Sequence, residues 1–213
     1  MSFPSQYAIR PEKPAAHRDG DLTRAKVLQA AAAQISAVGF HKMTIADVAA
    51  QAGVSQSGLL HHFPSKAALL AAVLDEREQT DSEFLFGDGT VPLGWDAFDS
   101  LVALAARNAT RPEWVQLFVR IAAEASVPSH PAHDWVTRHY RSLRKWLTDA
   151  VEAGVTAGQI RRDAPAALIA ETTIAVLDGV QQQWVVEPQA VAMVDNVREH
   201  VRVLKQAWSR PAA

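Results

Sequence analysis

Apolar residues recur every three or four positions along most of this sequence, the spacing that places side chains on one face of an α-helix. The first such run begins at Leu22 and includes Leu28 and Val38. It ends at Gly39, and glycine readily adopts the left-handed backbone that closes many helices. The pattern therefore predicts a first helix over residues 22–38 with one buried stripe.

Two short helical segments follow, each preceded by a residue whose side chain suits a helix N-cap. Thr44 precedes the segment IADVAAQA, which ends at Gly53. Ser55 opens the next segment, SQSGLLHHF, which stops at Pro64. Two short helices joined by a glycine turn predict a helix-turn-helix unit near residues 44–63.

The rest of the chain is also helical in pattern. Ser65 is expected to cap a longer helix, and the breaker-rich stretch GDGTVPLG at 87–94 separates this helix from a second helical region. No alternating run of β-branched residues between hairpin turns occurs, so the sequence predicts an all-α fold. In the second region helices are expected near residues 95–108, 112–126, 131–153, 165–186 and 189–208.

These elements suggest three parts. Residues 1–20 contain three prolines and no apolar period, which indicates a flexible N-terminal arm. Residues 21–80 form a helix-turn-helix domain of three helices, and residues 81–213 form a larger helical domain. The boundary is placed near residue 80, because the helix that starts after Ser65 should extend into both domains.

Composition excludes several classes of protein. The chain has no cysteine, and no apolar run approaches the roughly 18 to 20 residues that span a bilayer. It begins with no secretion signal, so we expect a cytoplasmic protein without a membrane partner. It also lacks a phosphate-binding loop, a GxSxG elbow and an HExxH motif, so we expect neither an enzyme nor a cofactor.

Charge is unevenly distributed, although the net charge is only -2. Residues 22–70 contain four basic side chains and one acidic one, a local balance of +3, whereas residues 81–213 contain 13 basic and 16 acidic side chains. Salt screens charges beyond about 8 to 10 Å, so the local balance governs contact with a polyanion. The helix-turn-helix region is therefore the part suited to DNA.

The second helix of this unit carries the side chains best placed to contact DNA. Gln56 and Ser57 lie at its start, where they can enter a major groove about 12 Å wide and form hydrogen bonds with base edges. Gly58 allows close approach of the helix backbone, or serves packing. His61 and His62 lie near the groove wall, where an imidazole can donate to a phosphate.

Residues at the starts of three successive helices supply further contacts. Thr44, Ser55 and Lys66 lie where free backbone N–H groups and the helix dipole favour an anion, so we include them among the DNA-binding residues. The alternative is a helical hairpin that binds no DNA, in which the caps only cap and Lys66 is solvated.

The segment TIADVAAQAGVSQSGLLHHFPSKAALLAAVL resembles the N-terminal signature of TetR-family regulators. The resemblance covers about residues 22–75 and implies that Thr44 and Lys66 anchor phosphates. It implies in the same way that Gln56 and Ser57 read bases.

One position departs from this family pattern. The family usually has a tyrosine that contacts the DNA backbone where this chain has Leu60, so that contact is lost. Part of its role would pass to His61.

The second half resembles the family more loosely, through LDGVQQQWVVEP at 177–188. The resemblance implies a homodimeric repressor that binds a palindromic, double-stranded operator and is released by a small apolar effector bound to residues 81–213. The alternative function is a helical small-ligand-binding protein or an adaptor whose helix-turn-helix does not bind DNA.

Two stripes at helical spacing are candidates for the dimer interface, unless they complete the core of the monomer instead. A smaller, flatter stripe precedes a larger apolar one. They consist of Leu168, Thr172, Ala175 and Gly179, and of Val194, Val197, Val201, Leu204 and Trp208.

No ligand-binding or metal-binding residue is assigned from the sequence. The histidines of HPAHD at 130–134, followed by His139, match no established ligand spacing, so no metal site is expected. Seven aromatic residues are candidates for an effector cavity, although such residues more often form ordinary core. They are Trp95, Trp114, Trp135, Trp146, Trp184, Phe98 and Phe118.

Overall fold

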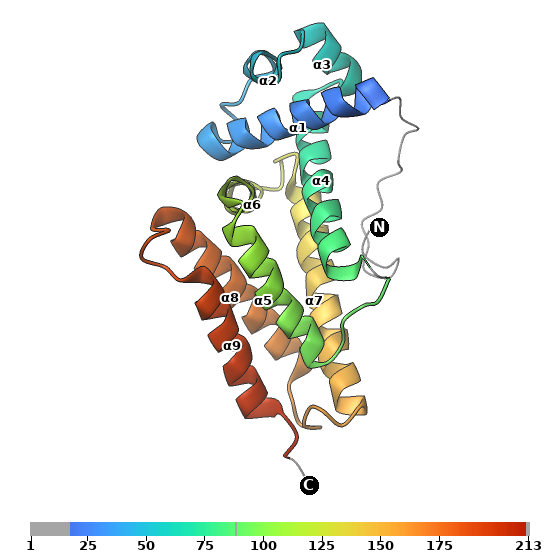
Figure 1. Cartoon of the computed structure of the whole chain (residues 1–213), viewed down its shortest axis with the longest axis vertical. Helices are drawn as coiled ribbons and strands as arrows, with labels where there is room; N and C mark the ends of the chain where they lie inside the picture. The colour runs from blue at the N-terminus through green and yellow to red at the C-terminus, as the bar shows by residue number, and fades with distance from the viewer. Residues whose placement is uncertain (1–17, 88, 212–213) are drawn as a thin grey trace. The chain divides into compact units, whose positions relative to one another are not determined.

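A computed structural model describes residues 18–87 and 89–211, which form nine helices and no strand (Figure 1). Within these ranges no helix is both long enough and apolar enough to cross a bilayer. The predicted all-α fold is confirmed. The helices are α1 (Arg18–Val38), α2 (Ile45–Ala52), α3 (Gln56–His62), α4 (Lys66–Phe86), α5 (Trp95–Ala109), α6 (Pro112–Glu124), α7 (His133–Thr156), α8 (Ala166–Val186) and α9 (Met193–Trp208).

The observed helix ends differ from the predicted ones mainly at α1 and α9. Helix α1 begins at Arg18, so residues 18–20 of the expected arm are helical, and residues 1–17 lie outside the described residues. Helix α9 begins at Met193, four residues later than predicted. Apolar spacing marks only turns that face a core, so it locates helix ends poorly.

The described residues divide into two compact units that are not continuous in sequence. The N-terminal unit comprises residues 18–80 and 113–137, and the C-terminal unit comprises residues 81–112 and 138–211. This division differs from the contiguous domains expected at residue 80, because most of α6 and the α6–α7 connection belong with the N-terminal helices.

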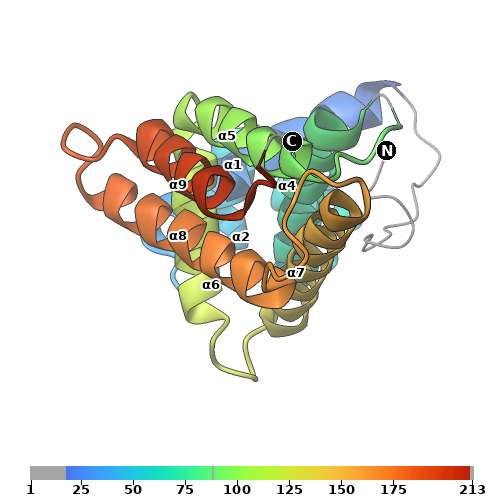
Figure 2. The same ribbon diagram turned by 90° about the horizontal axis from the view of Figure 1, so that it is seen from below.

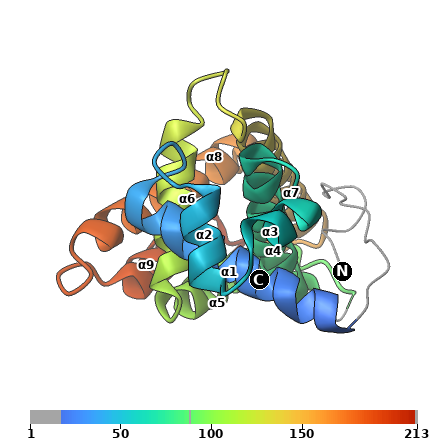
Figure 3. The same cartoon turned by 90° about the horizontal axis from the view of Figure 1, so that it is seen from above.

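Hydrogen bonds join α6 to α1 within the N-terminal unit. The Ser36 hydroxyl donates to the Glu113 carbonyl at 2.7 Å, and the Arg120 guanidinium donates to the Ala37 carbonyl at 3.3 Å. Figure 3 shows α1, α2 and α3 of this unit close together. Its largest fully buried side chains are those of Ile35, Met43, Leu59, Leu69, Leu70, Leu74, Leu117 and Ile121.

The core of the C-terminal unit is centred on Trp146 of α7. The Trp146 and Phe86 rings meet edge-on, with their centroids 5.2 Å apart. The Trp146 indole N–H donates to the Pro92 carbonyl at 3.0 Å. Helix α9 packs against both α5 and α8 (Figure 2). Their buried residues include Phe98, Leu101, Ile169, Ala170, Val201 and Leu204.

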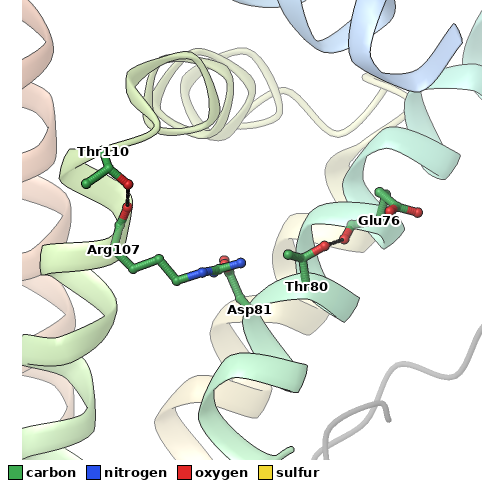
Figure 4. Close-up of polar contacts among 5 residues, drawn as sticks. All are labelled: Glu76, Thr80, Asp81, Arg107 and Thr110. Carbon is green, nitrogen blue, oxygen red and sulfur yellow. Dashed lines mark hydrogen bonds and ion pairs between the residues drawn. The ribbon is translucent and has the colours of Figure 1, made fainter. Parts of the chain in front are cut away.

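A partly buried ion pair links α4 and α5 within the same unit (Figure 4). Arg107 lies 2.7 Å from Asp81, and the two side chains are 20% and 15% exposed. The Thr110 hydroxyl donates to the Arg107 carbonyl and closes the end of α5. Next to Asp81 in α4, the Thr80 hydroxyl donates to the Glu76 carbonyl one turn earlier.

Part of the larger stripe predicted for a dimer interface is buried within one chain. Val197, Val201 and Leu204 of α9 are only 2%, 3% and 8% exposed, and the last two belong to the core of the C-terminal unit. Trp208 packs against that core beneath the Arg161 guanidinium. Val194 is half-buried. The buried residues of this stripe therefore complete the core of one chain, and a role of the stripe in a dimer stays a prediction.

The smaller stripe lies largely on the surface. Leu168 is 56% exposed, Thr172 and Ala175 are exposed, and Gly179 is half-buried. These α8 residues remain candidates for a dimer interface. On α9 the exposed apolar side chain is Val203, which is 47% exposed.

The aromatic residues proposed for an effector cavity are mostly core. Phe98 and Trp146 are buried in the C-terminal unit, and Phe118 and Trp135 are buried in the N-terminal unit. Three tryptophans are half-buried, namely Trp95, Trp114 and Trp184.

Candidate nucleic-acid interface

Helix α2 begins at a cap formed by Thr44. The Thr44 hydroxyl oxygen accepts from the Asp47 N–H at 3.1 Å and donates to the Asp47 carboxylate at 2.6 Å. Val48 and Ala49 are buried, so the opposite side of α2 faces solvent. Thr44 itself is exposed, as a DNA contact requires, but its hydroxyl is already engaged on both sides.

The turn between α2 and α3 depends on Gly53. Its φ is +69°, in the left-handed region, and its N–H donates toward the carbonyls of Ala49 and Ala50. The Val54 N–H also donates to the Ala49 carbonyl, at 3.0 Å. No atom lies within 4 Å of the position that a Cβ at Gly53 would occupy. Glycine is therefore favoured here by the backbone conformation and not by crowding.

Helix α3 begins immediately after this turn, with Ser55 as its cap. The Ser55 hydroxyl accepts from the Gly58 N–H at 3.0 Å and lies 3.1 Å from the Ser57 hydroxyl. A Cβ at Gly58 would lie 3.1 Å from the Ser55 hydroxyl oxygen. Gly58 thus makes room for the cap, which is the packing purpose that the sequence left open beside close approach to DNA.

The two faces of α3 differ in burial. Leu59 and Phe63 are only 0% and 4% exposed. Gln56 and Ser57, at the start of the helix, are exposed. The remaining exposed side chains of this helix are those of Leu60, His61 and His62.

Lys66 holds the start of α4 to the connection before α2. Its ammonium group donates to the His41 carbonyl at 2.9 Å and lies 4.7 Å from the centre of the Phe40 ring. His41 is three residues before Thr44, so the two expected phosphate anchors lie near one another. The sequence did not show this structural role, because it depends on how residues 39–44 fold back. One of the three ammonium donors is used, which leaves two for an anion.

Helix α1 supports the helix-turn-helix from behind. The Gln34 amide donates to the Gln51 amide oxygen at 2.8 Å, which joins α1 to α2. The Arg24 guanidinium lies 5.7 Å from the centre of the Phe63 ring and 3.7 Å from the Glu76 carboxylate of α4. These contacts hold the helix-turn-helix against longer helices. An isolated helix of seven residues, such as α3, is not stable in water without such packing.

The electrostatic surroundings of α3 favour an anion. Asp47 is the one acidic residue among residues 22–70, and the Thr44 hydroxyl donates to its carboxylate. Lys42 and the side chain of His41 are exposed beside the start of α2. The exposed amide, hydroxyl and cationic groups at the starts of α2 and α3 are of the kinds that can contact phosphates and bases.

Two family models match the chain. The model of bacterial regulatory proteins of the tetR family matches residues 27–73, which include α2, α3 and the start of α4. The model of the C-terminal part of BetI-type transcriptional repressors matches residues 99–205. Together they cover most of the described helices.

Characterised relatives are similar along most of their length. The HTH-type transcriptional regulator TtgR of Pseudomonas putida is 27% identical over 189 residues, which cover 84% of this chain and 88% of that protein. The HTH-type transcriptional repressor KstR2 of Mycolicibacterium smegmatis is 28% identical over 163 residues, which cover 75% of each chain.

Solved structures share the fold at lower identity. A TetR transcriptional regulator from Chloroflexus aurantiacus superimposes with a TM-score of 0.78 at 23% identity, covering 92% of this chain and all of the other. SmeT in complex with triclosan superimposes with a TM-score of 0.76 at 19% identity, covering 89% and 93%. SmeT is the repressor of a multidrug efflux pump of Stenotrophomonas maltophilia. On the family models, the relatives and the fold, this chain belongs to the TetR family of transcriptional regulators, which are not enzymes.

Proposed function

We propose that this regulator binds a palindromic operator as a homodimer and represses transcription until a small apolar effector releases it. The observation that carries the proposal is the orientation of α3, whose first residues Gln56 and Ser57 are exposed while Leu59 and Phe63 are buried. A recognition helix must present its N-terminal side chains in this way to read base edges.

Contacts of two kinds follow from this orientation. Gln56 donates and accepts through its amide and suits the edge of adenine, and Ser57 suits several bases. Lys66 uses its two remaining donors on a phosphate, and His61 and His62 donate to the backbone beside the groove. Leu60 is 42% exposed and offers only an apolar contact where the family usually has a tyrosine.

The homodimer is proposed to form through the exposed face of α8. Leu168, Thr172 and Ala175 lie at helical spacing on that face, and Val186 at the end of α8 is 70% exposed. Large apolar side chains that remain on a surface favour contact with a partner. Two-fold symmetry between subunits would require a palindromic operator with half-sites about one helical turn or slightly more apart.

The effector is proposed to bind within the C-terminal unit. Trp95 Nε1 and Gln181 Oε1 are buried and have no hydrogen-bond partner among the described residues, and buried polar atoms normally have one. Nearby on α8, the Asp178 carboxylate accepts from the Tyr140 hydroxyl at 2.8 Å. A mostly apolar ligand with one or two polar groups fits such surroundings. SmeT, which shares the fold, has been solved in complex with the small molecule triclosan.

Release requires that the effector bind two states of the dimer with different affinity. The direct test is a fluorescence-anisotropy titration of the protein against the DNA upstream of its own gene, at several salt concentrations. We expect tight binding to that duplex, weaker binding to a scrambled duplex, and weaker operator binding when a cognate apolar ligand is added. Equal, weak affinity for both duplexes would favour the alternative, a helical ligand-binding protein or adaptor that does not bind DNA.

A further inference from the structure

Three side chains with metal-binding atoms meet in the N-terminal unit. His41 lies in the connection between α1 and α2, Glu124 is the last residue of α6, and His130 lies in the connection before α7. One ligand atom of each lies within 4.8 Å of the ligand atoms of the other two. Sequence spacing led us to expect no metal site, because the three members come from separate segments that only folding brings together.

In each of the two inner members of the cluster, one ligand atom lacks a hydrogen-bond partner among the described residues. The His130 side chain is 2% exposed and the Glu124 side chain is 24% exposed. His130 Nε2 and Glu124 Oε2 are 3.5 Å apart, and neither forms a hydrogen bond among the described residues. Buried polar atoms are rarely left in this state, so the pair requires a third group between or beside them.

Burial lowers the pKa of His130, although the neighbouring Glu124 acts in the opposite direction and His41 adds a smaller lowering. Burial therefore acts against protonation of this imidazole. A metal binds an imidazole through a ring nitrogen that carries no proton.

The backbone around Gly39 makes room for the carboxylate. Gly39 has a φ of +83°, and a Cβ at this position would lie 2.6 Å from Glu124 Oε1. The Phe40 and His41 rings each meet the His130 ring edge-on, at centroid distances of 5.2 and 5.5 Å. The same Cβ position at Gly39 lies 3.6 Å from Nη1 of Arg120, so a guanidinium is near the carboxylate on this side, while the exposed His41 lies at the solvent side of the cluster.

We propose that His41, Glu124 and His130 bind one divalent transition-metal ion, for which Zn²⁺ fits the ligand set best. Two imidazoles and one carboxylate form a common set of protein ligands for zinc, with water in the fourth position. The ligand atoms must move closer together, because bonds from zinc to nitrogen and oxygen are about 2.0 to 2.2 Å long. The exposed His41 side chain is free to make most of this movement.

Coordination changes the position of one proton. In the metal-free protein His130 Nδ1 accepts from the Ala132 N–H at 3.2 Å, so the ring proton lies on Nε2. Binding a metal through Nε2 moves this proton to Nδ1 and breaks the long hydrogen bond. Nδ1 and the buried Ala132 N–H are then both donors without an acceptor, which lowers the affinity by roughly 5- to 150-fold relative to a site without this cost.

The test is a Co²⁺ titration of the full chain, without an affinity tag and after removal of metals by a chelator. Co²⁺ takes the place of Zn²⁺ in such sites and reports its ligands by visible absorption. We expect saturation at one Co²⁺ per chain, displacement by Zn²⁺, and a higher Tm with Zn²⁺.

Two variants and one control connect the signal to the cluster. Glu124→Gln and His41→Gln should each weaken Co²⁺ binding at least tenfold and abolish the rise in Tm, whereas His139→Gln removes one of the other histidines and should bind as the wild type does. Because His41 is exposed, His41→Gln decides the question alone if Glu124→Gln fails to fold by circular dichroism. Wild-type protein without saturable binding at one ion per chain, or a His41→Gln variant that binds as tightly as the wild type, would overturn the proposal.

Discussion

Lys66 illustrates how one side chain serves the fold and the proposed interface together. Its ammonium group donates to the His41 carbonyl and lies over the Phe40 ring, which holds the start of α4 beside the connection that leads to Thr44. The sequence indicated an anion-binding role for both residues from their places at helix starts. The hydrogen bond to His41 was not predictable, because it joins the start of α4 to a residue 25 positions earlier that lies in an irregular connection.

At the same scale, Gln56 should affect DNA specificity without affecting stability. Its side chain is exposed and forms no hydrogen bond among the described residues, so Gln56→Ala should change the free energy of unfolding by less than about 0.5 kcal/mol. Loss of a base contact should cost about 1 to 3 kcal/mol of operator binding. Anisotropy titrations with operator and scrambled duplexes measure the loss of binding, and urea denaturation measures the change in stability. Equal losses on the two duplexes would show that Gln56 does not read a base.

Among the helices, those whose ends carry a chemical signal were predicted best. Ser55 and Ser65 cap α3 and α4 as expected, through bonds of 3.0 Å to the N–H groups of Gly58 and Ala68. The start of α1 was missed, because its first turn lacks an apolar period. The stripe on α9 was identified correctly as a buried face, but spacing alone does not tell whether the same chain or a partner covers such a face.

The cap of α3 leads to a prediction about this short helix. Ser55→Ala removes the hydroxyl that accepts from the Gly58 N–H and should lower the free energy of unfolding by about 1 kcal/mol. Ser129→Ala is the matched control, because Ser129 is exposed and its hydroxyl forms no hydrogen bond among the described residues. Urea denaturation followed by circular dichroism compares the two. A control as unstable as Ser55→Ala would refute the assigned role of the cap.

For the whole molecule, the comparisons and the fold establish a TetR-family regulator, whereas its assembly remains a proposal. The exposed face of α8 is the surface that we assign to the homodimer, in place of the buried face of α9. The candidate metal cluster also depends on the fold of the whole chain, since folding alone brings His41, Glu124 and His130 together. Sequence spacing reports local faces and carries little information on such distant contacts.

The proposed dimer surface is tested by Leu168→Glu. Leu168 is 56% exposed in one chain, so the variant should fold normally, but a buried glutamate would weaken a dimer by several kcal/mol. Sedimentation velocity should then show monomers at concentrations where the wild type is dimeric. Val127→Glu, at a residue that is 55% exposed outside α8, is the control and should stay dimeric. Unchanged association of Leu168→Glu would exclude this face of α8 as the interface.

The central claim, that the face carrying α3 binds DNA, is tested most directly by the salt dependence of DNA affinity in Lys66→Ala. If Lys66 neutralises a phosphate, the variant should bind every duplex more weakly, and the slope of log affinity against log salt should become shallower by about 0.9. Lys145→Ala, which removes a lysine paired with Asp149 in α7, should leave the slope unchanged. A folded Lys66→Ala variant with wild-type affinity and slope would contradict the account.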